Sequence, residues 1–201
     1  MYVDETVLKF MGSREFESCL MQNETADATV AFIDICGFTA ISEKEKPDKV
    51  VQLLNEYFDV MVREIIAQSG LVDKFMGDCV MAVFKGEFHL DRAIDACLAI
   101  RNKIAALPGV GDFTPHVSIG INSGEMISGN IGSATLRRLD YTVIGDTVNT
   151  AQRLQTAAAA GQILIAEPCY EKIKQSFHCN RVGEVSMKNK SNNLVIYEVE
   201  D

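Results

Sequence analysis

Two periodicities in the hydrophobic positions divide the chain into strand-like and helix-like segments. The first strong strand signal is ATVAFIDI at 28–35, which is rich in β-forming residues and is followed by Gly37. A helix is predicted to begin at Pro47, because hydrophobic side chains then recur at spacings of three and four along one face. These positions are Val50, Leu54, Tyr57, Phe58, Met61 and Ile65. A second helix is expected from about Leu90 to Leu107.

Between the two predicted helices lies VDKFMGDCVMAVF, residues 72–84, which reads as two strands joined by a two-residue turn at Gly77 and Asp78. Strict alternation along the first strand predicts two faces. Val72, Lys74 and Met76 would share one face, and Asp73 and Phe75 the other.

The second half of the chain mixes short strands and helices. Strands are expected at 116–121 and 124–132, separated by a turn at Asn122–Ser123, and at 138–145, 163–166 and in a closing hairpin at 182–199. Helices are expected from Asp146, a good N-cap residue, to the alanine-rich stretch before Gly161, and at 168–177. Interleaved elements with short turns indicate an α+β, mixed-sheet domain over residues 28–201. Residues 1–27 are interpreted as a lead-in helix or linker.

Composition narrows the classes of function. The 201 residues suit one domain, and a formal net charge of -9 argues against a nucleic-acid polymer as partner. None of the six cysteines forms a C-x-x-C pair, which argues against a zinc site. No signal peptide or membrane-spanning run is visible, so a cytoplasmic location is expected for this domain, although a full-length protein could be attached to a membrane.

Two aspartates lie at the tips of hydrophobic strands. Alone, Asp34 could cap a turn, and Asp78 could be part of the hairpin turn. If the two strands are neighbours, however, the carboxylates converge and repel one another unless a cation lies between them. Ligands that are all oxygen atoms favour magnesium or manganese over zinc.

Other polar residues have a plain alternative reading. Lys74 could snorkel to solvent or point into a cleft, and Thr142 is an ordinary strand residue. Asn149 and Arg153 are an i, i+4 pair on one helix face, which suits either an exposed surface or the binding of an oxyanion. Lys188 and Lys190, taken alone, are surface lysines.

Taken together, these segments resemble a known family. FIDICGFT, VDKFMGDCVMAVF and YTVIGDTVNTAQRL resemble, in order and spacing, the catalytic domain of class III nucleotidyl cyclases, and SGEMISGNIGS and SMKNK extend the likeness over roughly residues 28–199. The resemblance implies a central mixed, mostly antiparallel sheet flanked by helices, with a ferredoxin-like core. It also implies a head-to-tail homodimer with active sites at its interface and, for the full-length protein, an upstream sensor domain.

The resemblance assigns the metal and phosphate chemistry residue by residue. Asp34 and Asp78 match the two metal-binding aspartates, and Ile35 matches a residue whose backbone carbonyl also touches a metal. Two Mg²⁺ ions are implied, and Mn²⁺ can substitute for them. Lys188 matches the triphosphate-binding lysine, with Lys190 as the alternative register. Further substrate contacts are expected from the residues after the first aspartate, namely Gly37, Phe38 and Thr39.

The remaining assignments concern ribose and base. Asn149 and Arg153 match the pair that orients ribose and stabilises the transition state, while Lys74 and Thr142 match the base-selecting positions. Threonine at the second of these positions resembles the subgroup that includes bicarbonate-responsive cyclases. Adenine presents an acceptor at N1 and a donor at its 6-amino group, which Lys74 and Thr142 complement.

The expected activity is therefore that of an adenylyl cyclase, a phosphorus–oxygen lyase. It would convert ATP to 3′,5′-cyclic AMP and pyrophosphate by two-metal-assisted attack of the ribose 3′-hydroxyl on the α-phosphate. Two alternative functions stay open. One is a guanylyl cyclase, against which Lys74 argues; the other is a non-catalytic cyclase-homology regulatory domain.

Overall fold

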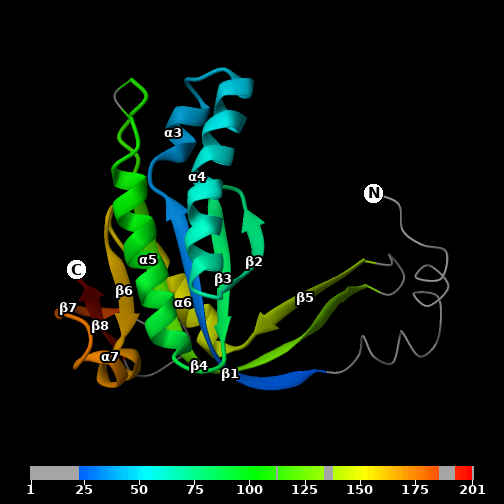
Figure 1. The fold of residues 1–201 in the computed structure, drawn as a ribbon, viewed down its shortest axis with the longest axis vertical. Helices are drawn as coiled ribbons and strands as arrows, with labels where there is room; N and C mark the ends of the chain where they lie inside the picture. The colour runs from blue at the N-terminus through cyan, green and yellow to red at the C-terminus, as the bar shows by residue number, and fades with distance from the viewer. Residues whose placement is uncertain (1–22, 112, 134–137, 186–192, 201) are drawn as a thin grey trace.

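The structure, a computed structural model, describes residues 23–111, 113–133, 138–185 and 193–200. Within these ranges the chain forms one sheet of eight strands with helices on both faces (Figure 1). The strands are β1 (Glu24–Ile35), β2 (Leu71–Met76), β3 (Cys79–Lys85), β4 (Val117–Ser133), β5 (Arg138–Ile144), β6 (Ile163–Ala166), β7 (Cys179–Val185) and β8 (Leu194–Val199). The helices are α3 (Phe38–Ser42), α4 (Pro47–Ala67), α5 (His89–Ala105), α6 (Asp146–Ala157) and α7 (Glu167–Ile173).

The sheet is mixed and mostly antiparallel, as the sequence predicts. Its order is β2-β3-β1-β4-β6-β8-β7, and β5 pairs with β4 beside this path. Among the strand pairs of the described ranges, only β4 and β6 run parallel. The outer part of β4 and its partner β5 extend away from the body of the sheet as an arm (Figure 1). The α+β prediction is confirmed.

The two long helices cover one face of the sheet. Helix α4 begins at Pro47, as predicted, and buries Leu53, Tyr57, Met61 and Ile65 against this face. Helix α5 packs beside α4 and is buried along its inner side. Neither these nor any other helix of the described residues is long and apolar enough to cross a membrane.

Helix α6 covers the opposite face, and a glycine lets it sit directly on the sheet. A Cβ atom at Gly120 on β4 would overlap the backbone nitrogen of Gln155 and the backbone oxygen of Ala151. The Gln155 side chain also donates a hydrogen bond to the Ser118 hydroxyl, at 2.9 Å between Nε2 and Oγ. The position of α6, and of every side chain it carries, therefore depends on the bare backbone at Gly120.

Gly120→Ala is accordingly expected to move α6 and to destabilise the fold by about 1–3 kcal/mol, since the added methyl group meets backbone rather than a flexible side chain. A urea titration should show a lower unfolding midpoint. An unchanged midpoint would mean that α6 is not held at this contact.

The β2–β3 hairpin turns at Gly77, which has φ 66°, as expected for the two-residue connection. The predicted strict alternation along β2 is wrong, because a bulge lies between Val72 and Lys74. Val72 and Phe75 now face α4, with the Phe75 ring 4.6 Å from that of Phe58 between centroids. Lys74 pairs with Met81, which is buried on the opposite face.

Other boundaries also differ from the predicted ones. The turn expected at Asn122–Ser123 is absent, because β4 continues through both residues while pairing with β1. Asn122 stays in the strand because its side-chain amide donates to the backbone oxygen of Thr147 on α6, at 3.1 Å. Strand β1 begins at Glu24, inside the predicted lead-in segment, whereas residues 1–22 lie outside the described part. The predicted N-cap Asp146 is instead the first helical residue, after Gly145.

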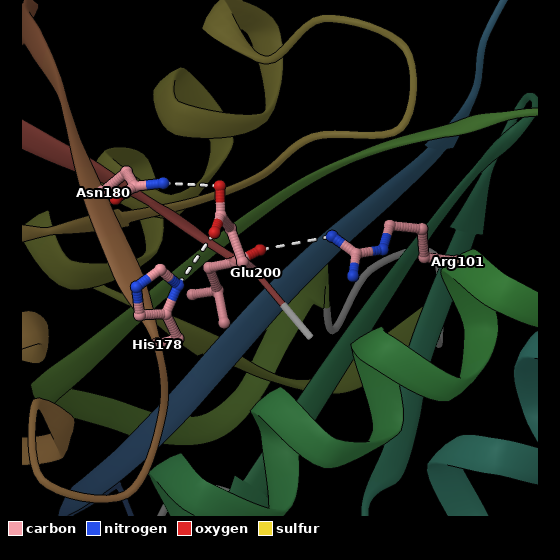
Figure 2. A network of polar contacts seen from close by, with 5 residues as sticks. Arg101, His178, Asn180 and Glu200 are labelled. Atoms are coloured by element: carbon pink, nitrogen blue, oxygen red, sulfur yellow. Dashed lines mark hydrogen bonds and ion pairs between the residues drawn. The ribbon is translucent and has the colours of Figure 1, made fainter.

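The C-terminal strand is tied to the rest of the domain by polar contacts (Figure 2). Arg101 on α5 donates to the backbone oxygen of Val199 at 3.2 Å. The Glu200 carboxylate contacts His178 Nδ1 at 2.8 Å and accepts a hydrogen bond from Asn180. The predicted closing hairpin is thus present as β7 and β8, anchored to α5.

Candidate active site

Two carboxylates meet where β1 and β3 lie side by side. Asp34 pairs with Cys79 in the antiparallel register, and the backbone nitrogen of Ile35 donates to the backbone oxygen of Asp78 at 3.4 Å. Burial, followed by the nearby Asp78 carboxylate, raises the pKa of Asp34 to about 6. The neighbouring strands assumed in the sequence reasoning are therefore present, and the two carboxylates converge.

This pair has the chemistry of a site for a hard divalent cation. A half-buried carboxylate next to a second one is destabilised until a cation compensates both charges. Oxygen donors of this kind suit Mg²⁺ or Mn²⁺. Burial raises the pKa of the adjacent Cys79 thiol to about 12, and burial likewise raises the pKa of Cys36. Both thiols therefore stay protonated and act as packing groups beside the carboxylates.

The segment after Asp34 turns sharply into the short helix α3. Gly37 has φ 76° and accepts a hydrogen bond from the backbone nitrogen of Ala40 at 3.1 Å. The Phe38 side chain is buried in the hydrophobic core, whereas Gly37 and Thr39 are exposed. A ligand at this turn would therefore meet the backbone of Phe38 rather than its ring.

A second polar cluster joins β2 to β5. Thr142 Oγ1 donates to Asp73 Oδ2 at 2.8 Å, and Lys74 Nζ lies 3.3 Å from the same oxygen. The side chain of Asp73 is only 6% exposed, against 37% for Lys74. Thr142 is also 6% exposed. The two predicted base-selecting residues are thus brought together through a third residue, Asp73, to which the sequence reasoning gave no role.

Helix α6 carries the predicted amide and guanidinium. Asn149 is exposed and Arg153 is partly buried, one helical turn apart. The start of the helix is fixed by Thr147, whose hydroxyl donates to the backbone oxygen of Glu125 at 2.8 Å. Together with the contact at Gly120, this bond holds α6 against β4.

Asp34 and Lys74 lie on the face of the sheet that α6 covers in part. Asp34 continues the inward-facing positions Val30 and Phe32, which pack with Met81 and with Ala151 of α6. Lys74 pairs with that same Met81. The predicted triphosphate lysines, Lys188 and Lys190, belong to residues 186–192, which lie outside the described ranges.

Comparisons with known proteins identify the family of this fold. Residues 20–200 match the family model of the adenylate and guanylate cyclase catalytic domain. The crystal structure of the adenylyl cyclase CyaB from P. aeruginosa is 34% identical, with a TM-score of 0.84, and the match covers 90% of this chain and 97% of that one. The guanylyl cyclase Cya2 is 30% identical, with a TM-score of 0.80, over 89% and 94% of the two chains.

Among sequence relatives, adenylate cyclase 1 of Rhizobium meliloti is 32% identical over 190 residues, which is 86% of this chain. The chain spans only 27% of the length of that relative. Since the family model covers nearly the whole chain and the fold matches that of solved members, the chain belongs to the adenylate and guanylate cyclase catalytic domain family, the class III nucleotidyl cyclases.

Proposed function

We propose that the chain is the catalytic domain of an adenylyl cyclase that converts ATP to 3′,5′-cyclic AMP and pyrophosphate. One observation carries the proposal. One cyclase-family fold carries both a convergent carboxylate pair and a lysine–threonine pair. The donor and acceptor of the second pair complement the N1 acceptor and 6-amino donor of adenine.

In the proposed reaction the ribose 3′-oxygen bonds to the α-phosphorus while the bond from that phosphorus to the bridging β-phosphate oxygen breaks. The 3′-hydroxyl proton passes to Asp34, to a water or to a phosphate oxygen of the substrate, and pyrophosphate leaves. Asp34, Asp78 and the backbone carbonyl of Ile35 would hold two Mg²⁺ ions, which lower the pKa of the 3′-hydroxyl and neutralise polyphosphate charge. Arg153 would donate to the phosphoryl oxygens as their charge grows, and Asn149 would orient the ribose. Lys188, or Lys190 in the alternative register, would bind the triphosphate, together with Gly37, Thr39 and the backbone of Phe38.

Lys74 and Thr142 would select the base. An ammonium group can only donate, so Lys74 suits the N1 acceptor of adenine and opposes the N1–H donor of guanine. The closeness of both residues to Asp73 Oδ2 supports their acting on one base.

Lys74→Glu is therefore expected to reverse the preference between nucleotides. A carboxylate accepts from guanine N1–H but repels adenine N1, and a buried mismatch of this kind can cost about ten-thousandfold in discrimination. The kcat/KM values for ATP and GTP should be measured on both chains. A variant that keeps the wild-type ratio would remove Lys74 from base selection.

We further propose that the active enzyme is a head-to-tail homodimer. The arm formed by β4 and β5 exposes large apolar side chains that a second copy would cover. They are Ile127, Ile131, Tyr141 and Ile144, with exposed fractions of 39–55%. Asp34 and Asp78 of one copy would then act on the same nucleotide as Lys74, Thr142 and Arg153 of the other.

Turnover tests the proposal directly. The purified chain, with Mg²⁺ or Mn²⁺, should form cyclic AMP from ATP and far less cyclic GMP from GTP. Preferential use of GTP would make the domain a guanylyl cyclase, an outcome that the similarity to Cya2 leaves within the family. Absence of either product from a folded dimer would favour the non-catalytic alternative.

A further inference from the structure

Asp73 lies in this site but has no role in the proposed reaction. Its side chain is 6% exposed, although carboxylates are seldom so buried unless paired. Its Oδ2 atom accepts a hydrogen bond from the Thr142 hydroxyl at 2.8 Å and lies 3.3 Å from the Lys74 ammonium nitrogen. The buried Asp73 carboxylate therefore contacts both residues that would select the base.

The bulge in β2 creates this arrangement. In a regular strand, neighbouring side chains point to opposite faces. Because the register shifts between Val72 and Lys74, the chain places Asp73 within reach of Lys74 on its own strand and of Thr142 on β5. The bulge leaves one residue of β2 outside the regular pairing with β3. Bulges often redirect a side chain in this way.

The contact also fixes the hydrogen-bonding polarity of Thr142. A threonine hydroxyl has one proton and two lone pairs, so a free hydroxyl can rotate to donate or to accept. Here the proton is used in the bond to Asp73 Oδ2, since a carboxylate oxygen can only accept. Toward any other group, Thr142 can offer only lone pairs. Lys74 forms an ion pair with the same oxygen, and its ammonium group can only donate.

We propose that Asp73 is a specificity-determining positioning residue, which turns the Thr142 hydroxyl into an obligatory acceptor. This inference rests on the proposed adenylyl cyclase function. The resulting edge, one acceptor beside one donor, matches the 6-amino group and N1 of adenine. This edge disfavours binding of a 6-oxo purine, because the 6-oxygen is an acceptor and needs a donor opposite it. Without Asp73, Thr142 can rotate and donate to that oxygen.

The test compares ATP with inosine triphosphate, which differs at the N1 and C6 edge and lacks the 2-amino group of guanine. The ratio of kcat/KM values for the two nucleotides should fall about tenfold in Asp73→Ala, the worth of one hydrogen bond. In Asp73→Asn the ratio should stay within about threefold of wild type, because two neighbouring donors turn the amide oxygen toward Thr142. An Asp73→Ala chain with an unchanged ratio, or an Asp73→Asn chain with the alanine ratio, overturns the proposal.

A second arm asks whether the effect passes through the Thr142 hydroxyl. In a Thr142→Val chain, adding Asp73→Ala should leave the ratio unchanged, since no hydroxyl remains to be oriented. An equal further fall in that background would show that Asp73 acts by another route, against the proposal. A merely structural role would lower turnover of both nucleotides in parallel and leave every ratio alone.

Partial unfolding or low activity of a variant does not change the comparison of these ratios. Each ratio comes from one enzyme preparation below its unfolding midpoint, so the active fraction cancels. If a variant turns over neither nucleotide, the ratio of its dissociation constants for ATP and inosine triphosphate is compared with the same ratio for the wild type. If the wild type forms no cyclic product at all, the proposed function fails. If it prefers ATP and Asp73→Ala keeps that preference, only the role of Asp73 fails.

Discussion

Asp34→Asn is expected to lower cyclic-nucleotide formation by roughly a thousandfold or more and yet to stabilise the metal-free domain. The activity falls because half of the carboxylate pair is lost, and a bound metal supplies several kcal/mol of charge stabilisation in such reactions. The stability rises because the substitution removes a half-buried charge that Asp78 repels. Asp34 is still partly solvated, so after screening we expect about 1 kcal/mol, or ~2–4 °C in Tm.

The same residue predicts a pH dependence of stability. The folded chain holds the Asp34 proton up to about pH 6, whereas the unfolded chain releases it near the ordinary aspartate pKa of 3.8. Between these values the folded state binds more protons, so the stability of the metal-free domain falls as the pH rises. The difference in Tm between Asp34→Asn and wild type, measured in chelator, should therefore grow from pH 4 to pH 6.5. Added Mg²⁺ or Mn²⁺ should reduce it.

A matched control is Asp59→Asn on the outer side of α4. Asp59 is 58% exposed and pairs with Arg63 one turn away, at 2.6 Å, a kind of pair that contributes little. That variant should keep wild-type turnover and show no growing difference between pH 4 and pH 6.5. Equal behaviour of the two variants would refute the placement of Asp34 in a charged, half-buried pair.

Arg153→Ala has the second largest expected effect, a loss of about 10²–10³ in kcat with a smaller change in KM. The reason is that the guanidinium would act mainly where charge grows in the transition state. Arg153→Lys should restore only part of the rate, because an ammonium group lacks the rigid fork of donors. The measurement is steady-state turnover of ATP, with circular dichroism to show that α6 is intact. A rise in KM alone would assign Arg153 to substrate binding instead.

Much of the fold is readable from the sequence because local patterns and tertiary packing agree. The stripe that begins at Val50 predicts α4, and its continuation at Tyr57, Met61 and Ile65 is buried in the structure. The β2–β3 turn follows from Gly77, which adopts the left-handed backbone that a tight hairpin needs. In both places one local signal decides the element.

The errors arise where tertiary contacts override a local signal. Asn122 looks like a turn residue, but α6 supplies its amide with a partner, and β4 continues. The bulge at Asp73 has no local marker, since VDKFMG reads as a regular strand. The link between Asp73 and Thr142 spans 69 positions, so no pattern along the chain could indicate it. The candidate site itself was predictable only as far as its residues match family motifs.

In the proposed homodimer, two copies of this chain together complete each cyclic-AMP-forming site. The most direct test mixes an Asp34→Ala chain with an Arg153→Ala chain and measures cyclic AMP formed from ATP. Each homodimer lacks one essential group in both sites, whereas a mixed dimer would carry both substitutions in one site and leave the other whole. We predict that mixing restores activity to about a quarter of wild type, since random pairing makes half the dimers mixed and each has one working site. No recovery, although mixed dimers are demonstrated, would contradict the shared site.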